Sequence, residues 1–402
     1  MTMNVRPWAR SFFTIWTGQA FSLFGSSAAQ FAIVWWLTEQ TGSASVLAMA
    51  GMAGFLPQAL IGPFAGVWVD RLSRKRVMIA ADLFIAAASG AMAVTFLLGS
   101  PAPWVVYLIL FLRAVGSVFH APAIQAAMPL LVPESELTRT AAWSQFLQSG
   151  SYMAGPVLGA LMMAAFPMPA IMLADIVGAL IAVTTLLAVR IPDPEQGAAR
   201  QPDLLGEMKE GLNLVVQNRA LFLVTLSMTL FAVILLPVSS LFPLMVKGHF
   251  GGTAWHAGLV EFTFAGGMLV SSLLLGVWGG LPDRLAMVAL SQFGLGASLA
   301  ASGLLPSSAI VTFAAFSALM GFTGTLGNPS CVALVQSSVP PESLGRVFAL
   351  MTSLVSLATP FGLFVAGPVA EMVGVATWFL ISGVLILLTG IWTFWKSRGL
   401  TS

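Results

Sequence analysis

The stretch GPFAGVWVDRLSRKR, from Gly62 to Arg76, concentrates charge in an otherwise apolar part of the chain. It places one carboxylate, Asp70, next to four cations. The apolar runs on both sides are long enough to cross a bilayer. We therefore expect a tight polar loop between two membrane-spanning helices.

The composition of the chain excludes an ordinary soluble enzyme. Of its 402 residues, 58% are hydrophobic and 8% are charged, whereas a typical globular domain carries about 25% charged residues. Such a chain must be solvated largely by lipid. Cys331 is the single cysteine, so neither a disulfide within the chain nor a thiolate metal site is expected.

Apolar runs of about 20 residues predict membrane-spanning helices, because a helix of that length crosses the roughly 30 Å hydrocarbon core. The runs are continuous and do not alternate with a period of two residues, which favours helices over the strands of a barrel. Twelve spans are predicted, at residues 12–37, 44–68, 77–98, 103–127, 139–165, 169–189, 220–246, 256–279, 285–304, 309–335, 344–369 and 373–395.

The positions of Lys and Arg predict the orientation of these spans. With the N-terminus in the cytoplasm, 15 of the 17 basic residues fall in cytoplasmic segments, where such residues are normally in excess. Both termini are therefore expected in the cytoplasm, and the net charge of +2 reflects topology and not a nucleic-acid partner. The first apolar run is expected to be a retained span and not a cleaved signal peptide.

A long polar connection from Arg190 to about Asn218 divides the chain. It predicts an N-terminal six-helix bundle at residues 1–189, a cytoplasmic linker at 190–218 and a C-terminal six-helix bundle at 219–402. The second part of the linker has apolar residues at helical spacing, which predicts an amphipathic helix at the cytoplasmic face. A solvated linker with some helix is the alternative, because two glycines weaken the pattern.

Short matches between the halves indicate an internal repeat. Pro133-Glu134-Ser135 recurs as Pro341-Glu342-Ser343, and Gly66-Val67-Trp68 recurs as Gly276-Val277-Trp278, within offsets of roughly 207 to 213 residues. The predicted fold is therefore an all-α integral membrane protein of twelve transmembrane helices in two pseudo-symmetric bundles. Transporters built in this way bind their cargo between the halves, near the membrane midplane.

Ionisable residues within the spans are candidates for proton coupling or buried charge. Arg113 lies about halfway along the fourth span, where an arginine is costly unless it is paired or faces water. Its candidate partners are Asp82 and Asp175. Burial disfavours the charged form of a carboxylate, which would let Asp82, Asp175 or Glu261 load and release a proton. Hydrogen-bonded structural roles are favoured for the two aspartates, and Glu261 is the preferred coupling candidate.

Amide and aromatic side chains in the spans would suit a cavity for a bulky amphipathic ligand, because they combine apolar contact with few directional bonds. For each residue alone, packing between helices is the alternative. The candidates are Gln19, Gln30, Trp35, Trp36, Gln145, Gln148 and Asn328, with His120, Gln125 and Gln336 beside them. Neither catalytic nor metal-ligating residues are expected, since no nucleophile motif, phosphate loop or metal-ligand spacing occurs.

The segment from Gly62 to Arg76 resembles the loop between the second and third helices of major facilitator transporters. The wider resemblance is to the Mef-type macrolide efflux proteins, in the stretches FFTIWTGQAFSL, TGSASVLAMAGMAGFLP, GPFAGVWVDRLSRKRVMIAADL, FHAPA, LLVPE, LFPL and LGRVFAL, in that order. This resemblance implies a major facilitator fold in a bacterial cytoplasmic (inner) membrane. It also implies export of macrolide antibiotics in exchange for protons, with the proton gradient as energy source, no cofactor and a monomeric state.

The resemblance also implies roles for particular residues. Gating or coupling roles fall on Gly66, Asp70, Arg71, Arg74 and Arg113, and the fifth-helix motif of exporters falls on Gly155, Pro156 and Gly159. The start of a helix carries partial positive charge, and Arg346 opens the eleventh span. We predict that Asp70 and Arg346 latch the two halves together when the cytoplasmic side is closed. A positive-inside anchor that only sets topology is the alternative.

Three functions remain open. The favoured one is a macrolide/H⁺ antiporter that works by alternating access. The second is an exporter of another amphipathic compound, such as a siderophore. The third is a membrane receptor or lipid scramblase without coupled transport, which predicts no dependence of efflux on the proton gradient.

Overall fold

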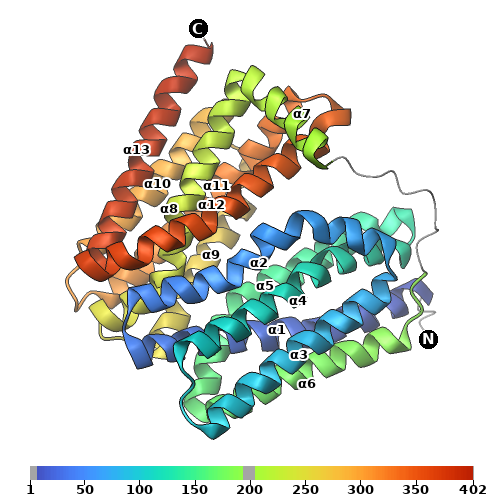
Figure 1. Ribbon diagram of the computed structural model, residues 1–402. Helices are drawn as coiled ribbons and strands as arrows, with labels where there is room; N and C mark the ends of the chain where they lie inside the picture. The colour runs from blue at the N-terminus through green and yellow to red at the C-terminus, as the bar shows by residue number, and fades with distance from the viewer. Residues whose placement is uncertain (1–6, 193–203, 402) are drawn as a thin grey trace. The chain divides into compact units, whose positions relative to one another are not determined.

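The computed structural model describes residues 7–192 and 204–401, and helices make up nearly all of both ranges (Figure 1). Most of the irregular part of the predicted linker lies outside the described residues. The α-helices are α1 (Pro7–Thr41), α2 (Ala44–Arg71), α3 (Arg74–Leu98), α4 (Pro103–Ala127), α5 (Leu137–Ala165), α6 (Met168–Ala188), α7 (Leu204–Gln217), α8 (Arg219–Leu244), α9 (Ala254–Trp278), α10 (Arg284–Gly303), α11 (Ile310–Ser338), α12 (Leu344–Val373) and α13 (Val375–Thr401).

Eleven helices of the described ranges are long and apolar enough to cross a membrane. The two others differ in length. α5 has 29 residues and is less apolar, since its first half carries residues such as Gln145 and Gln148. α7 has 14 residues and is amphipathic. The predicted all-α membrane fold is confirmed, with helix ends a few residues from the predicted ones.

The charged segment from Gly62 to Arg76 is mostly helical, which corrects the predicted loop. α2 continues through Asp70 to Arg71, and α3 begins at Arg74. Only Leu72 and Ser73 connect them. Arg71 lies in the last turn of α2, where a cation is favourable next to the negative end of the helix dipole.

The chain forms two compact units. The N-terminal unit comprises the chain up to Trp36 and from Ala53 to the linker, and the C-terminal unit comprises Leu37–Met52 and the chain after the linker. The end of α1 and the start of α2 therefore group with the second half of the sequence.

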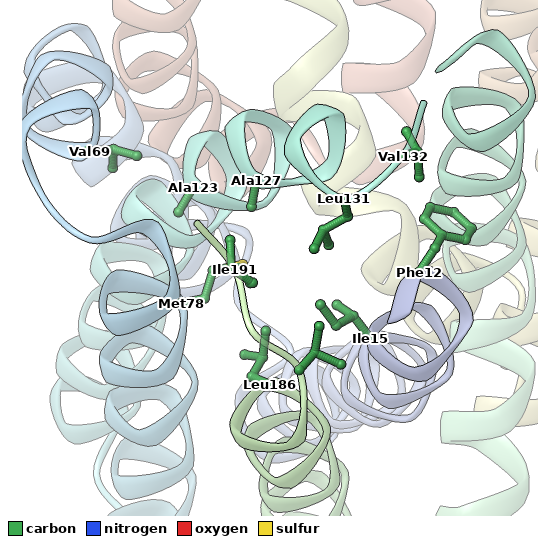
Figure 2. Packing of buried hydrophobic residues seen from close by; sticks show 11 residues of the cluster. Phe12, Ile15, Val69, Met78, Ala123, Ala127, Leu131, Val132, Leu186 and Ile191 are labelled. Carbon is green, nitrogen blue, oxygen red and sulfur yellow. The ribbon is translucent and has the colours of Figure 1, made fainter. Parts of the chain in front are cut away.

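A buried apolar cluster holds the N-terminal unit together where α2 ends and α3 begins. Figure 2 shows three side chains that point toward one another. They are Ile15 of α1, Leu186 of α6, and Leu131 of the segment between α4 and α5. Phe12 of α1 belongs to the same cluster and is fully buried. Because lipid is as apolar as these side chains, they stabilise the unit through close packing. The cluster comprises Phe12, Ile15, Val69, Met78, Ala123, Ala127, Leu131, Val132, Leu186, Val189 and Ile191.

Small residues let helices of the C-terminal unit approach closely. A Cβ added at Gly267 of α9 would lie 1.9 Å from the carbonyl oxygen of Ala318. One added at Gly321 of α11 would lie 1.9 Å from that of Phe264. Only glycine fits at these two points, so α9 and α11 pack backbone against backbone.

The second part of the linker is the helix α7, and it packs on the C-terminal unit. Val215 is buried in a cluster with Leu221, Val335, Val339, Val347 and Leu350. Leu214 is half-buried against the same cluster, whereas Met208, Leu212 and Val216 are exposed. One edge of the amphipathic face thus packs on protein and the other is free for the membrane interface.

The buried cluster in the N-terminal unit predicts a large effect of Phe12→Ala. Phe12 is 0% exposed, so truncation leaves a cavity and should lower the free energy of unfolding by about 3–5 kcal/mol. The measurement is thermal unfolding of the detergent-purified protein. Phe21→Ala on the same helix is the control, because Phe21 is 60% exposed. Equal shifts for the two variants would contradict the assigned packing.

Candidate functional site

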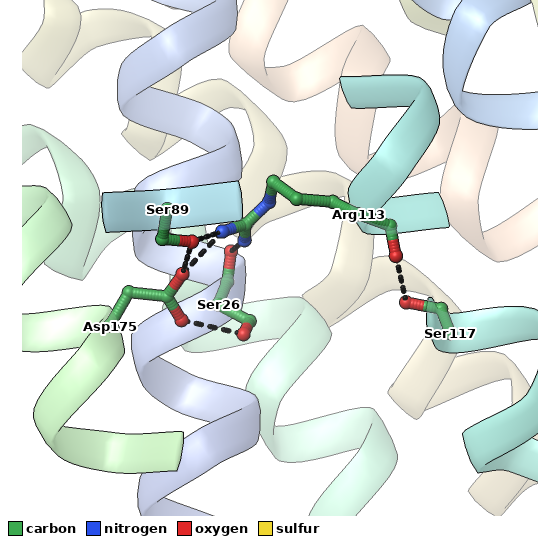
Figure 3. Close-up of polar contacts among 5 residues, drawn as sticks. All are labelled: Ser26, Ser89, Arg113, Ser117 and Asp175. Atoms are coloured by element: carbon green, nitrogen blue, oxygen red, sulfur yellow. Dashed lines mark hydrogen bonds and ion pairs between the residues drawn. The ribbon is translucent and has the colours of Figure 1, made fainter. Parts of the chain in front are cut away.

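A buried ion pair lies within the N-terminal unit (Figure 3). The guanidinium of Arg113 on α4 contacts the carboxylate of Asp175 on α6. Ser89 of α3 donates to Asp175 Oδ2 at 2.7 Å, and Ser26 of α1 donates to Oδ1 at 2.7 Å. Arg113 also contacts the hydroxyl of Ser89 and donates to the backbone carbonyl of Ser26. Of the two partners predicted for Arg113, the structure selects Asp175.

Hydrogen bonds to neighbouring hydroxyl groups offset the cost of burying this ion pair. Removing two ions from water is costly, and the cost is recovered only where their remaining hydrogen-bonding capacity is filled. Ser26 and Ser89 fill it for the carboxylate. The cluster therefore links α1, α3, α4 and α6 through one point inside the unit.

Asp82 belongs to a second buried cluster. Its Oδ2 accepts a hydrogen bond from Gln19 Nε2 of α1 at 3.4 Å. Its Oδ1 lies 3.4 Å from His120 Nε2 of α4. Asp82 is 3% exposed and the His120 side chain 14%. Gln19, predicted as a cavity residue, is thus buried inside the unit, where it binds a carboxylate.

The predicted gating residues have different environments. Gly66 lies in open space, because a Cβ added there would meet no atom within 4 Å. Arg71 is exposed, and Arg74 has a buried Nε without a described hydrogen-bond partner. Arg346 of α12 forms an ion pair with Glu210 of α7. The side chain of Asp70 lies outside the described residues, so its pairing with Arg346 stays a prediction.

Two polar contacts at helix ends were not found by sequence reasoning. Lys75 Nζ donates to the carbonyl oxygens of Leu187 and Val189, at 3.1 and 2.8 Å, and so caps the end of α6. Within the C-terminal unit, the Glu371 carboxylate accepts from Ser43 Oγ at 2.9 Å and from Ser45 N at 3.0 Å, at the start of α2. Both contacts are favourable with respect to the helix dipole. The cation of Lys75 lies at the negative C-terminal end of α6, and the anion of Glu371 lies at the positive N-terminal end of α2. Their partners are more than 100 residues away, so no local pattern reports them.

The predicted exporter motif lies where α5 meets α1. A Cβ added at Gly155 would lie 2.4 Å from Ser27 Cβ, and one added at Gly159 would lie 2.7 Å from the carbonyl oxygen of Ala28. Pro156 between them is buried. The motif is thus a close contact between two helices of the N-terminal unit.

The other predicted cavity residues fall into buried and exposed groups. Trp35 is fully buried and its ring stacks on Phe31, so it packs inside the protein. Trp36 is half-buried and meets Phe96 edge to face. The exposed candidates are Gln30, Gln145, Gln148 and Asn328. Their ligand role stays a prediction.

Glu261, the preferred coupling candidate, is a half-buried residue of α9. Within the described part of the chain its carboxylate has neither an ion pair nor a hydrogen bond. It therefore differs from Asp175, whose charge is fully compensated.

Comparison with known proteins places this helical chain in a family. Residues 4–398 match the family described as transmembrane secretion effectors, a branch of the major facilitator superfamily. The chain belongs to this family. It is 43% identical to macrolide efflux protein A of Streptococcus pyogenes over 96% of the chain and 95% of that protein. It is 29% identical to the multidrug efflux pump Tap of Mycobacterium tuberculosis, over 91% and 88%.

Solved structures agree with the family fold. The nucleoside transporter NupG aligns with a TM-score of 0.74 at 15% identity, over 96% of this chain and 98% of that one. A bacterial homologue of the iron transporter ferroportin aligns with a TM-score of 0.70 at 16% identity, over 96% and 98%. The major facilitator fold is confirmed, and the chain is a drug exporter and a multi-pass bacterial membrane protein.

The buried ion pair predicts a strong effect of Asp175→Asn. This variant leaves the Arg113 charge without its partner, so the free energy of unfolding should fall by about 3–5 kcal/mol. The double variant Arg113→Met with Asp175→Leu removes both charges and should recover most of that loss. Thermal unfolding in detergent is the measurement, and a double variant less stable than Asp175→Asn would argue against the pair.

The helix contact at the exporter motif predicts that Gly159→Ala is destabilising. The new methyl group would meet the Ala28 carbonyl and the Phe31 ring, and such overpacking costs about 1–3 kcal/mol. Gly54→Ala in α2 is the matched control, because a Cβ there meets no atom within 4 Å. The measurement is the unfolding temperature of each variant. An unfolding temperature of Gly159→Ala equal to that of wild type would contradict the close approach of α5 and α1.

Proposed function

We propose that this protein exports macrolide antibiotics from the bacterial cytoplasm or inner leaflet in exchange for protons. The observation that carries the proposal is the 43% identity to macrolide efflux protein A, which extends over 96% of the chain. A likeness of that extent includes both halves of the fold and the linker. The energy source is the proton gradient, without a cofactor, and the protein acts as a monomer and not as an enzyme.

The arrangement of charge supports transport driven by protons. A membrane interior penalises isolated charges, so the ionisable residues kept there are costly and serve a purpose. Arg113 and Asp175 form a compensated pair, whereas Asp82 and Glu261 have no described basic partner except His120 beside Asp82. The proposed coupling carboxylates are therefore Asp82 and Glu261, whose charge no described Lys or Arg compensates.

The cytoplasmic gate is proposed at the end of α2. Asp70 and Arg346 pair when the cytoplasmic side is closed, with both termini in the cytoplasm. Arg346 forms an ion pair with Glu210, so its guanidinium is placed to bind a carboxylate, which supports this proposal. Gly66, Arg71 and Arg74 complete the gating segment.

Multidrug export is the second candidate function. The observation that favours it is the similarity to Tap, whose name describes a multidrug efflux pump, over 91% of the chain. Amphipathic cargo of other kinds, siderophores included, belongs to this second candidate function. Uncoupled receptor or scramblase activity has no counterpart among these relatives.

Drug accumulation in a pump-deleted bacterial host tests the proposal. Cells expressing the protein should hold several-fold less labelled erythromycin than cells with an empty vector, and a protonophore should abolish the difference. Equal accumulation in expressing and empty-vector cells, without the protonophore, would contradict the macrolide assignment. Lower accumulation that persists with the protonophore would reject proton exchange, and a panel of unrelated amphipathic drugs separates macrolide export from multidrug export.

A further inference from the structure

Buried polar clusters occupy corresponding places in the two halves of the chain. In the N-terminal unit, Gln19 of α1 binds Asp82 of α3 at 3.4 Å. In the C-terminal unit, Gln292 of α10 donates to Ser227 of α8 at 2.7 Å. Ser227 stands 208 residues after Gln19, and Gln292 stands 210 residues after Asp82, which is the spacing of the internal repeat. All four residues are buried.

The cluster of the C-terminal unit is complete with neutral groups. The hydroxyl groups of Ser227 and Thr393 lie 2.9 Å apart, and Thr393 donates to Gln292 Oε1 at 3.4 Å. Amide and hydroxyl groups thus join α8, α10 and α13 without an ionisable side chain. A polar contact at this place in the fold therefore does not require a carboxylate.

The cluster of the N-terminal unit has a carboxylate and an imidazole at this place. His120 Nε2 lies 3.4 Å from Asp82 Oδ1, but the two are not aligned as a hydrogen bond. Nε2 is buried and forms no hydrogen bond with any described residue. Histidine changes charge near neutral pH more readily than other side chains. A carboxylate and an imidazole, both able to take up a proton, thus lie beside each other.

The cations near Asp82 and His120 in the sequence have other partners or lie beyond ion-pair distance. Arg113 of α4 and Asp175 of α6 bind each other, and Lys75 of α3 binds the end of α6. Within the described ranges, no Lys or Arg lies within ion-pair distance of Asp82. The remaining titratable groups of α1 to α4 are Arg10, Glu39, Asp70, Arg71, Arg74, Arg76 and Tyr107.

We propose that Asp82 and His120 form a proton-binding site in the N-terminal unit. One proton from water adds to His120 Nε2, next to Asp82 Oδ1, and takes the pair from a net charge of −1 to 0. The same proton leaves from Nε2 later in the cycle. Gln19 holds the carboxylate in place through its amide N–H. His120 is the more exposed member of the pair, at 14% against 3% for Asp82. The inference rests on the proposed exchange of drug for protons and names residues that carry the proton.

The first test uses no drug. The chain has three histidines, so spectra of the detergent-purified full chain with ¹⁵N-labelled histidine identify His120 by comparison with His120→Gln. The ring-nitrogen signals of His120 are then followed as the pH is changed. Asp82→Asn should move the midpoint of this change, because the proposed site places both side chains next to the same proton. Ser227→Ala, at the corresponding place in the other half, is the control and should leave the midpoint unchanged. An identical midpoint in Asp82→Asn would overturn the site.

The second test measures protons released when erythromycin is added to the purified protein in weak buffer. Wild type should release protons, and Asp82→Asn and His120→Gln should still bind the drug, measured by tryptophan fluorescence, without releasing them. Unchanged release in both variants would overturn the inference. If wild type does not bind erythromycin, the proposed cargo fails and the titration of His120 still decides the site. If Asp82→Asn does not fold, proton release by His120→Gln decides it.

Discussion

The compensation of charge inside a lipid-solvated bundle is the constraint on which the N-terminal unit depends. An ionised side chain there has no water to replace a lost partner, so Arg113 must be paired wherever the helices move. Asp175 supplies the charge, and Ser26 and Ser89 fill the remaining hydrogen bonds of its carboxylate. Four helices are thereby held at one point, and the glycines of α5 bring a fifth against α1.

The two halves share a fold but differ in chemistry. The C-terminal unit meets the need for a buried polar contact with Gln292, Ser227 and Thr393, which are neutral. At the corresponding place the N-terminal unit has Asp82 and His120. An internal repeat reproduces helix packing because packing depends on size and shape, whereas a single substitution can change charge without changing the backbone. At this place in the fold, the N-terminal unit thus has ionisable groups where the C-terminal unit has neutral ones.

The linker contributes more than a connection between the halves. α7 buries Val215 against the C-terminal unit, and its Glu210 binds Arg346 at the start of α12. The arginine proposed for the cytoplasmic gate therefore already has a carboxylate partner. Any gate that uses Arg346 must compete with Glu210, which makes α7 part of the same electrostatic system.

Hydropathy alone identified the eleven described helices that are long and apolar enough to cross a membrane, because the bilayer demands about 20 consecutive apolar residues and a helix that satisfies its own backbone. The sequence also marked Arg113, Asp82 and Asp175 as buried charges, but left open which aspartate binds the arginine. Only the tertiary structure decided that Asp175 does, that His120 lies next to Asp82, and that Lys75 caps α6. The physical reason is that pairing depends on the rotation of each helix about its axis. Packing against all its neighbours sets that rotation, and no single segment encodes it.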